Sequence, residues 1–548
     1  MADSNETTLR IEAYHQRTKH HFQRYAAGPN GLDWQNQPNP FRTFKGCDVI
    51  KLPLTQQAPD VLYRELYLPG TPAKQAITLA TIAQLFEFSL GLSAWKSYDD
   101  SRWALRCNPS SGNLHPTEAY VVVPDYDDIS RGVYHYVSRD HALEKRCTPD
   151  KEAIFTLPSH GFLLGLSSIF WREAWKYGER AYRYCQHDVG HAIAAIRYAA
   201  GIQGWQATVI DTASDTDVST LLGLNRDQDF VDAEREHPDV LLWVTPDLAI
   251  IEVEAHSLEI SELAANVKKA RWVGQANQLS MRHGHQWQII EEACKATVKP
   301  SVLEERWQPS ELPKLEFDLT DSTHRASALI QQRRSAQAFD GSGRLSESAF
   351  YQMLDLLLTR PKVAPMDTIP WASKVHLLLF VHRVENVEPG LYLFLRQASS
   401  LSLFQAKMKA DFDWQKPEGC PEHLPLYHLQ SGDARSAAKS LSCDQEIASD
   451  GVISFGMLAE FRSVVAQKPW QYRQLFWEAG MLGQILYLEA EAMGFRGTGI
   501  GCYFDDGVHD LLGLEDTDIQ SLYHFTIGVS LEDTRLQTLP PYAHLQGA

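Results

Sequence analysis

The chain has 548 residues and a formal net charge of −18 at pH 7, from 51 basic and 69 acidic side chains. A single hydrophobic core stops growing well below this length, so at least two domains are expected. The acidic balance excludes nucleic acid and anionic membranes as expected partners, because both select basic surfaces.

Apolar side chains make up 44% of the residues, enough for large cores in a fully folded protein. No stretch approaches the roughly 18 apolar residues of a membrane span, and the polar start lacks a secretory apolar region. The eight cysteines are scattered without a C-x-x-C pair. Reduced thiols, a cytoplasmic location and no bound metal are therefore expected.

The predicted elements begin with an arm, residues 1–55, whose aromatic-rich segment His20–Lys51 is expected to dock on the protein. A first domain follows at 56–252, a connector with one helix at 253–325, and a second domain at 326–548. Apolar periodicity and Gly stops predict the following elements in chain order: strand Ala119–Val123, helix 182–203, strand Val240–Thr245, helix Ile260–Lys269, helix Ser346–Leu358, strand Val375–Val381, helix 472–493 and strand His524–Val529.

The two predicted domains share an internal similarity. A constant offset of 290 residues carries Tyr182-Arg183 onto Tyr472-Arg473, Gly190 onto Gly480, Gly204 onto Gly494 and Leu221–Leu224 onto Leu511–Leu514. At another offset, Gly132-Val133-Tyr134 matches Gly390-Leu391-Tyr392. Ordered matches with shared patterning predict two diverged copies of one α+β fold.

The second copy carries two segments suited to a phosphate-bearing ligand. Arg333, Arg334 and Ser335 precede a helix, where guanidinium groups and a hydroxyl can bind phosphate, although an Arg pair can also be a solvated surface feature. The run Gly497–Gly501 is predicted to be a loop whose backbone approaches a flat ring or a phosphate, with a plain turn as the alternative.

The first copy carries the polar segment Pro109–Pro116, which leads into a strand. The hydroxyls of Ser110 and Ser111 and the amide of Asn113 suit the polar edge of a heterocycle, and a capped turn is the alternative.

Together these segments resemble the nitroreductase flavoproteins: Arg-Arg-Ser before a long helix, Pro-Ser-Ser-x-Asn before a strand, and a Gly-x-Gly-Ile-Gly loop near the end. The run Lys176–Tyr184 followed by Asp188–His191 is similar to the SagB-type dehydrogenases, which include azoline oxidases. The resemblance covers the chain from about Tyr14.

The resemblance implies an α+β fold in which two units exchange elements and FMN lies between them. The implied FMN contacts are shared between the two copies: Arg333, Arg334, Ser335, Gly499, Ile500, Gly501 and the near-terminal Arg535 from the second, and Pro109, Ser110, Ser111 and Asn113 from the first. The mirror-image site lacks its motifs, because Arg64–Pro69, Thr208–Asp211 and Met366–Trp371 stand in their places. One site in an intrachain pseudo-dimer is therefore expected.

For chemistry, the resemblance implies proton transfer by Lys176 and Tyr177, and a solvated helix face is the alternative for this pair. His187 and His191 have the spacing of a metal pair, but the sequence offers no third ligand. His191 matches Met481, which favours a packing role.

The implied function is an FMN-dependent oxidoreductase that transfers hydride between flavin and an organic substrate. Oxidation of an azoline-like ring or of a peptide is the reaction that the resemblance suggests. NAD(P)H or dioxygen is the expected redox partner. Two alternatives stay open: an NAD(P)H-dependent reductase of nitroaromatics or quinones, and a non-catalytic flavin-binding scaffold subunit of a peptide-modifying complex.

Overall fold

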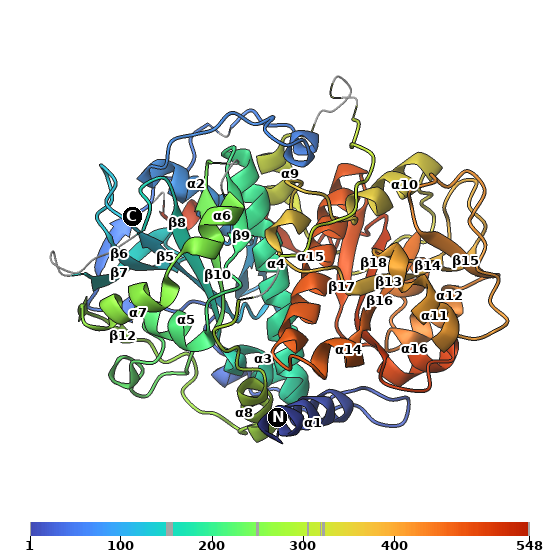
Figure 1. Ribbon diagram of the computed structural model, residues 1–548, viewed down its shortest axis with the longest axis horizontal. Coiled ribbons are helices and arrows are strands. Elements are labelled where there is room, and N and C mark those ends of the chain that lie inside the picture. Colours follow the sequence, from blue (N-terminus) through green and yellow to red (C-terminus); the bar gives the residue numbers. More distant parts are fainter. Residues whose placement is uncertain are drawn as a thin grey trace.

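The computed structural model describes residues 2–545 except 58, 150–156, 248–250, 304–305, 318 and 320–323. Two α+β halves lie on either side of a central pair of long helices (Figure 1). Up to residue 245 the elements are α1 (Ala2–Arg17), β1 (Phe44–Lys45), β2 (Asp48–Lys51), α2 (Leu79–Ser89), β3 (Leu92–Tyr98), β4 (Ser101–Arg106), β5 (Thr117–Val123), β6 (Gly132–Val137), β7 (Ala142–Thr148), β8 (Phe162–Ser168), α3 (Phe170–Tyr177), α4 (Ala181–Ile202), β9 (Gln206–Val209), α5 (Asp215–Leu221) and β10 (His237–Thr245).

The rest of the chain forms a connector and the second half. The connector contains α6 (Ile251–Ser257), α7 (Ile260–Lys268), β11 (Arg271–Trp272), β12 (Gln275–Ala276) and α8 (Gln288–Ala296). The second half contains α9 (Ala326–Gln332), α10 (Glu347–Leu356), β13 (Val375–Val381), β14 (Gly390–Phe394), α11 (Leu401–Lys407), β15 (Leu426–Ser431), α12 (Arg435–Leu441), α13 (Ile447–Asp450), β16 (Ile453–Glu460), α14 (Phe461–Val465), α15 (Gln471–Ala492), β17 (Arg496–Ile500), α16 (Asp505–Leu512), β18 (Ile519–Gly528) and β19 (Gln537–Leu539).

The two main sheets have the same strand order. One contains the path β7-β6-β5-β8-β10-β9, extended by β11 and β2 at its β7 edge, and the other is β15-β14-β13-β16-β18-β17. Neighbouring strands along both paths pair antiparallel. Each half therefore repeats one strand topology around one long helix, α4 or α15, as the internal similarity predicts.

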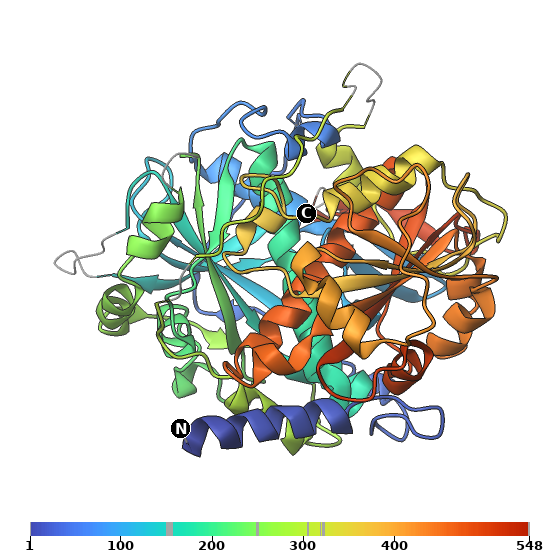
Figure 2. The same ribbon diagram turned by 45° about the vertical axis from the view of Figure 1, so that its right-hand side comes forward.

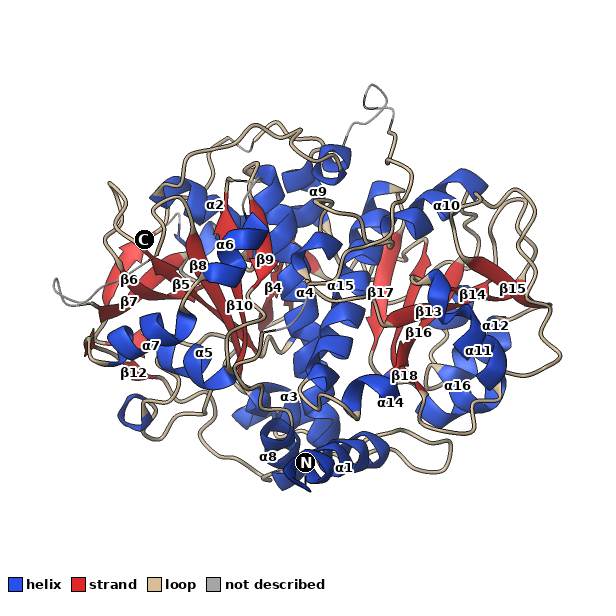
Figure 3. Ribbon diagram, viewed as in Figure 1, coloured by secondary structure: helices blue, strands red, loops and turns tan. Residues whose placement is uncertain are grey.

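The central helices α4 and α15 lie side by side (Figure 2). They cross at two glycines related by the 290-residue offset. A Cβ atom on Gly190 would lie 2.1 Å from the carbonyl oxygen of Trp477, and one on Gly480 would lie 2.2 Å from that of His187. Only glycine permits this close approach of the two backbones. The buried apolar side chains of both halves form one continuous core cluster that includes residues of both central helices, so the halves form one body. The two main sheets lie on either side of this helix pair (Figure 3).

Each terminus packs on the opposite half. On α1 the Thr8 hydroxyl donates to the Val465 carbonyl, and Lys19, just beyond this helix, pairs with Asp506 at 2.9 Å. At the other end β19 pairs with β3 of the first half, and the Tyr542 hydroxyl accepts a hydrogen bond from the Leu92 amide at 2.9 Å. Elements are thus exchanged between the halves, as the resemblance implies.

Two local details differ from the sequence prediction. Gly497–Gly501 is mostly the edge strand β17, because its backbone pairs with β18, rather than a free loop. The arm begins with the long helix α1, which sequence reasoning did not predict. Among the described residues, no helix is both long and apolar enough to cross a bilayer.

Candidate active site

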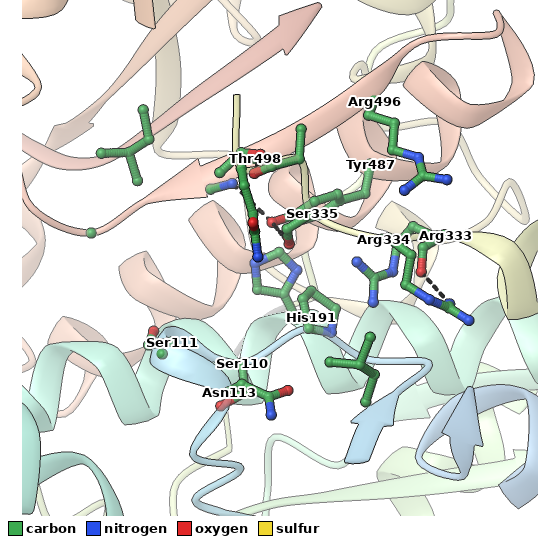
Figure 4. A pocket seen from close by; sticks show the side chains of 18 of the residues that line it. Ser110, Ser111, Asn113, His191, Arg333, Arg334, Ser335, Tyr487, Arg496 and Thr498 are labelled. Carbon is green, nitrogen blue, oxygen red and sulfur yellow. Dashed lines mark hydrogen bonds between the residues drawn. The ribbon is translucent and has the colours of Figure 1, made fainter. Parts of the chain in front are cut away.

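A cavity of about 440 Å³ lies between the halves, where the turn Ser110–Asn113 faces β17 (Figure 4). This volume falls in the range of small-molecule and cofactor sites. Eleven of the predicted site residues line it: Pro109, Ser110, Ser111, Asn113, Tyr177, Arg333, Arg334, Ser335, Gly499, Ile500 and Gly501. The two predicted site residues absent from its lining are Lys176 and Arg535.

Arg333 and Arg334 follow the end of α9 and place two guanidinium groups at one side of the cavity (Figure 4). Arg333 is 4% exposed, donates one hydrogen bond of 3.1 Å to the Arg106 carbonyl, and leaves its Nε without a partner. Arg334 donates to the Ser93 carbonyl at 2.9 Å. Burial lowers the pKa of Arg333, and burial together with Arg333 lowers the pKa of Arg334 to about 10.

Three more basic side chains line the same cavity: Lys96, Arg106 and Arg496. Arg106 is buried, and desolvation lowers its pKa to about 10. Among the described residues, only Arg496 of the five lining cations forms ion pairs, with Glu491 at 3.4 Å and Glu532 at 3.2 Å. Buried cations without counterions are costly, so the cluster favours an anionic ligand.

Arg535 does not lie in this cluster. Its side chain is 71% exposed and pairs with Asp533 at 2.7 Å. Arg496, at the start of β17, supplies the second half's further basic group instead. The expectation for Arg535 is therefore corrected: the short Asp533–Arg535 turn satisfies its guanidinium locally. An Arg directly before Gly-x-Gly was the signal for Arg496 in the sequence.

The glycines of β17 make room for tyrosines. A Cβ atom on Gly499 would lie 1.9 Å from the Tyr523 hydroxyl oxygen, and one on Gly501 would lie 2.4 Å from a ring carbon of Tyr184. The Tyr487 hydroxyl accepts from the Gly499 amide at 2.9 Å and lies 2.8 Å from the Ser335 Oγ. Tyrosine side chains pack so tightly behind the strand that these positions must be glycine. This requirement holds independently of any ligand that approaches the strand.

The turn from the first half is held in a left-handed conformation, with φ of 58° at Gly112 and 60° at Asn113. The side-chain amide of Asn113 donates to the Ala104 carbonyl at 2.9 Å, so a hydrogen bond to β4 stabilises the turn. A Cβ atom on Gly112 would lie 2.5 Å from the Tyr177 hydroxyl oxygen and 3.1 Å from the Lys176 Nζ. The Lys-Tyr pair therefore abuts this turn, with Tyr177 reaching the cavity and Lys176 half-buried beside it.

Sequence reasoning missed several lining residues: Arg106, Tyr184, Asp188, Tyr487, Arg496 and Tyr523. It also assigned His191 to packing alone, yet His191 lines the cavity and lies 3.2 Å from the Tyr523 hydroxyl. Burial lowers the pKa of His191 to about 3, so its ring is neutral. His187 stacks on Tyr523 with ring centroids 4.3 Å apart, and the described residues contain no cluster of three or more metal-ligand side chains.

The mirror-image position holds a cavity of only about 20 Å³. It is lined by Arg197 and Gln206, which the 290-residue offset relates to Tyr487 and Arg496. Arg197 forms an ion pair with Asp367 at 2.8 Å, in the 3-10 turn Met366–Thr368. Protein side chains thus fill the space that forms the cavity on the other side.

Solved structures share this fold. A protein from Anabaena variabilis described as a candidate nitroreductase superposes over 95% of this chain and 99% of its own, with a TM-score of 0.68 and 22% sequence identity. A nitroreductase-type protein from Exiguobacterium sibiricum in complex with FMN covers 37% of this chain and 88% of its own, at 12% identity and a TM-score of 0.23. The first match shows that the chain has the nitroreductase fold over nearly its whole length, which confirms the predicted fold class.

One curated protein is similar in sequence. The trifolitoxin-processing protein TfxB of Rhizobium leguminosarum bv. trifolii is 37% identical over 130 residues, which are 21% of this chain and 35% of TfxB. The chain thus spans about a third of the length of this relative. No family model matches the chain.

Proposed function

We propose that the protein is an FMN-dependent oxidoreductase of the SagB type, with one flavin site built from both halves. The observation that carries this proposal is the cavity itself, where the Arg333–Ser335 segment and the Ser110–Asn113 turn meet beside the unneutralised arginines. The repeated units would comprise residues 56–252 and 326–548, and the protein would act in the cytoplasm.

The residues present fit FMN. The unpartnered Nε of the buried Arg333 can donate to a phosphate oxygen, and Arg334 and Arg496 supply charge beside it. Ser335 and the backbone of Thr498–Gly501 would face the ring, and the first half's turn would cover it from the other side. When bound, FMN supplies hydride transfer, while the protein supplies binding, orientation and electrostatics.

The chain's own chemistry lies at Lys176 and Tyr177. The Tyr177 hydroxyl points at the turn that lines the cavity, and the Lys176 Nζ lies 5.2 Å from the Tyr177 ring centroid. Burial raises the pKa of Tyr177, so its hydroxyl keeps its proton at neutral pH and can donate or pass it. The pair would thus move the proton that accompanies hydride transfer.

A peptide carrying an azoline ring is the substrate class that we propose. The SagB-type resemblance and the 130-residue similarity to a toxin-processing protein both favour peptide modification. Dioxygen would reoxidise the flavin in this direction. Trp103, Leu105 and Leu536 among others line the cavity and offer apolar surface for a substrate.

Anaerobic mixing of the FMN-loaded protein with a synthetic thiazoline-bearing peptide tests this function. We expect the peptide to bleach the flavin absorbance and to gain a thiazole, as mass spectrometry would show by the loss of two hydrogens. NAD(P)H in place of the peptide is expected to leave the flavin oxidised. Rapid bleaching by NAD(P)H with no response to the peptide would favour the reductase alternative, and no response to either would favour the scaffold.

A further inference from the structure

Asp188, on α4, is a buried acid on the cavity wall with no cation to balance it. It is 1% exposed, and its carboxylate accepts 3.1 Å hydrogen bonds from the amide and the hydroxyl of Ser111. Among the described residues it forms no ion pair. Hydrogen bonds from Ser111 and the nearby Ser110 hydroxyl compensate only part of the cost of burying a charge.

The second half has a buried acid at the equivalent helix position, and hydrogen bonds and an ion pair compensate that acid. The 290-residue offset carries Asp188 to Glu478 on α15, which is equally buried. Glu478 accepts from the Lys374 and Val375 amides at 3.0 and 3.2 Å and pairs with Arg396. The equivalent helix position thus holds an acid ion-paired with Arg396 in the second half, and an acid without an ion pair among the described residues on the wall of the open cavity.

A second buried acid lies behind Asp188. Glu173, on α3, is 0% exposed, and neither of its carboxyl oxygens has a hydrogen-bond partner. The Ser110 side chain lies close to both acids. Burial, and next the charge of Asp188, raises the pKa of Glu173 well above its ordinary value, which favours its neutral form. Burial raises the pKa of Asp188 to about 7.

Other titratable groups surround the two acids. They are Arg172, Lys176, Tyr177, Tyr184, Cys185 and Tyr523. Arg172 is paired with Glu118, and burial raises the pKa of the three tyrosines and of Cys185. Of the two acids, only Asp188 lines the cavity.

We propose that Asp188 is the proton acceptor of this cavity, positioned by Ser111 and reached through the Tyr177 hydroxyl. The proposal rests on the proposed function. A two-electron dehydrogenation releases one hydride and one proton from the substrate; the hydride leaves to the bound flavin. The Tyr177 hydroxyl takes the substrate's proton as it passes its own to the Asp188 carboxylate, which later releases it to solvent. In the reductive direction the same proton returns.

Flavin-free protein tests the proton-holding role without any substrate. Infrared spectra across pH 4 to 9 are expected to show loss of a buried carboxylic-acid band with a midpoint near pH 7, because burial raises the pKa of Asp188 to about 7. Asp188→Asn should remove the component with a midpoint near pH 7 and leave that of the buried Asp239, whose pKa burial raises to about 6. Ser111→Ala should raise the midpoint of the Asp188 component, because a donor to the charged form is lost. An unchanged band in the Asp188→Asn variant would overturn the assignment.

Stability against pH supplies an independent readout with a defined sign. The folded pKa of Asp188 lies above its ordinary value of 3.8, so the folded state binds the extra proton between about pH 4 and 7. Wild-type stability should therefore fall relative to Asp188→Asn as pH rises through this window. Equal pH dependence in urea unfolding would contradict the proposal.

Flavin reduction by the thiazoline peptide tests the catalytic part. The wild-type rate should rise with pH through an inflection near 7, and Asp188→Asn should lose the inflection together with about 10²–10⁴-fold in rate. The matched control is Asp239→Asn, which removes another buried acid with a raised pKa that does not line the cavity. It should keep the profile. If no thiazoline peptide bleaches the flavin, the proposed substrate class is wrong. The infrared titration then still tests whether Asp188 holds a proton near neutral pH.

Discussion

Tyr177→Phe and Lys176→Ala are expected to retain full flavin content and to lose about 10²–10⁴-fold in substrate-driven flavin reduction, the usual contribution of general acid–base catalysis. The reason is that flavin binding and proton transfer are assigned to different residues of the cavity. The proposed phosphate and ring contacts lie on Arg333, Ser335 and β17, whereas the Lys-Tyr pair abuts the turn at Gly112. Stopped-flow absorbance with the thiazoline peptide, beside flavin content after gel filtration, measures both quantities.

Tyr182→Phe is the matched control, because Tyr182 is a buried tyrosine of the same segment whose hydroxyl contacts Thr297 instead of the cavity. It should reduce flavin within a few-fold of wild type. Dithionite reduction needs no protein base and should survive in all three variants. If Tyr177→Phe and Lys176→Ala also turn over within a few-fold of wild type, the pair is only a helix surface. A joint loss of flavin, folding and turnover would give it a structural role.

Arg333→Ala is expected to weaken FMN binding by ~1.5–3 kcal/mol, or roughly 10- to 150-fold in Kd, the range of a charge-assisted hydrogen bond. Arg333 is a buried cation whose Nε has no hydrogen-bond partner among the described residues, so this donor is available to a phosphate. Titration of flavin-free protein with FMN, followed by fluorescence quenching, gives Kd directly. Raising the salt concentration should weaken wild-type binding more than that of the variant.

Two further variants separate phosphate binding from folding. Arg333→Lys keeps the charge but loses the planar fork, and should bind FMN with an affinity between those of wild type and Arg333→Ala. Arg535→Ala removes an exposed arginine that pairs with Asp533, and should leave Kd unchanged. A loss in Arg535→Ala as large as that in Arg333→Ala would return Arg535 to the site. Equal affinity of wild type and Arg333→Ala would remove Arg333 from it.

The architecture was accessible from the sequence because its strongest signals are local or periodic. Helices 182–203 and 472–493 are predicted within one residue of α4 and α15, and the strand Val375–Val381 is confirmed as β13. The offset between Gly190 and Gly480 predicts the repeat, and the structure explains it by the backbone contact that both glycines make at the helix crossing. The helix α1 was missed because its apolar face is short and packs on elements distant in sequence.

The cavity wall was less accessible, because it is formed by residues whose neighbours lie in the other half. Asp188 and His191 are interior positions of α4, and periodicity gives them no distinction from core residues. Arg496 directly precedes Gly497–Gly501, and the sequence suggested a role only for the backbone of that run. Arg535 was placed by resemblance alone, and a local carboxylate holds it outside the cavity. Long-range contacts, rather than local patterns, decide which side chains face a cavity.

The number of FMN molecules bound per chain tests the central claim most directly. Flavin-free protein would be titrated with FMN by calorimetry, and released flavin would be counted against protein by absorbance. Because the cavity on the mirror-image side measures only about 20 Å³, and its lining residue Arg197 is ion-paired with Asp367, one FMN per chain is expected. Two FMN per chain would contradict the closed mirror site, and no binding would contradict the flavin site formed by both halves.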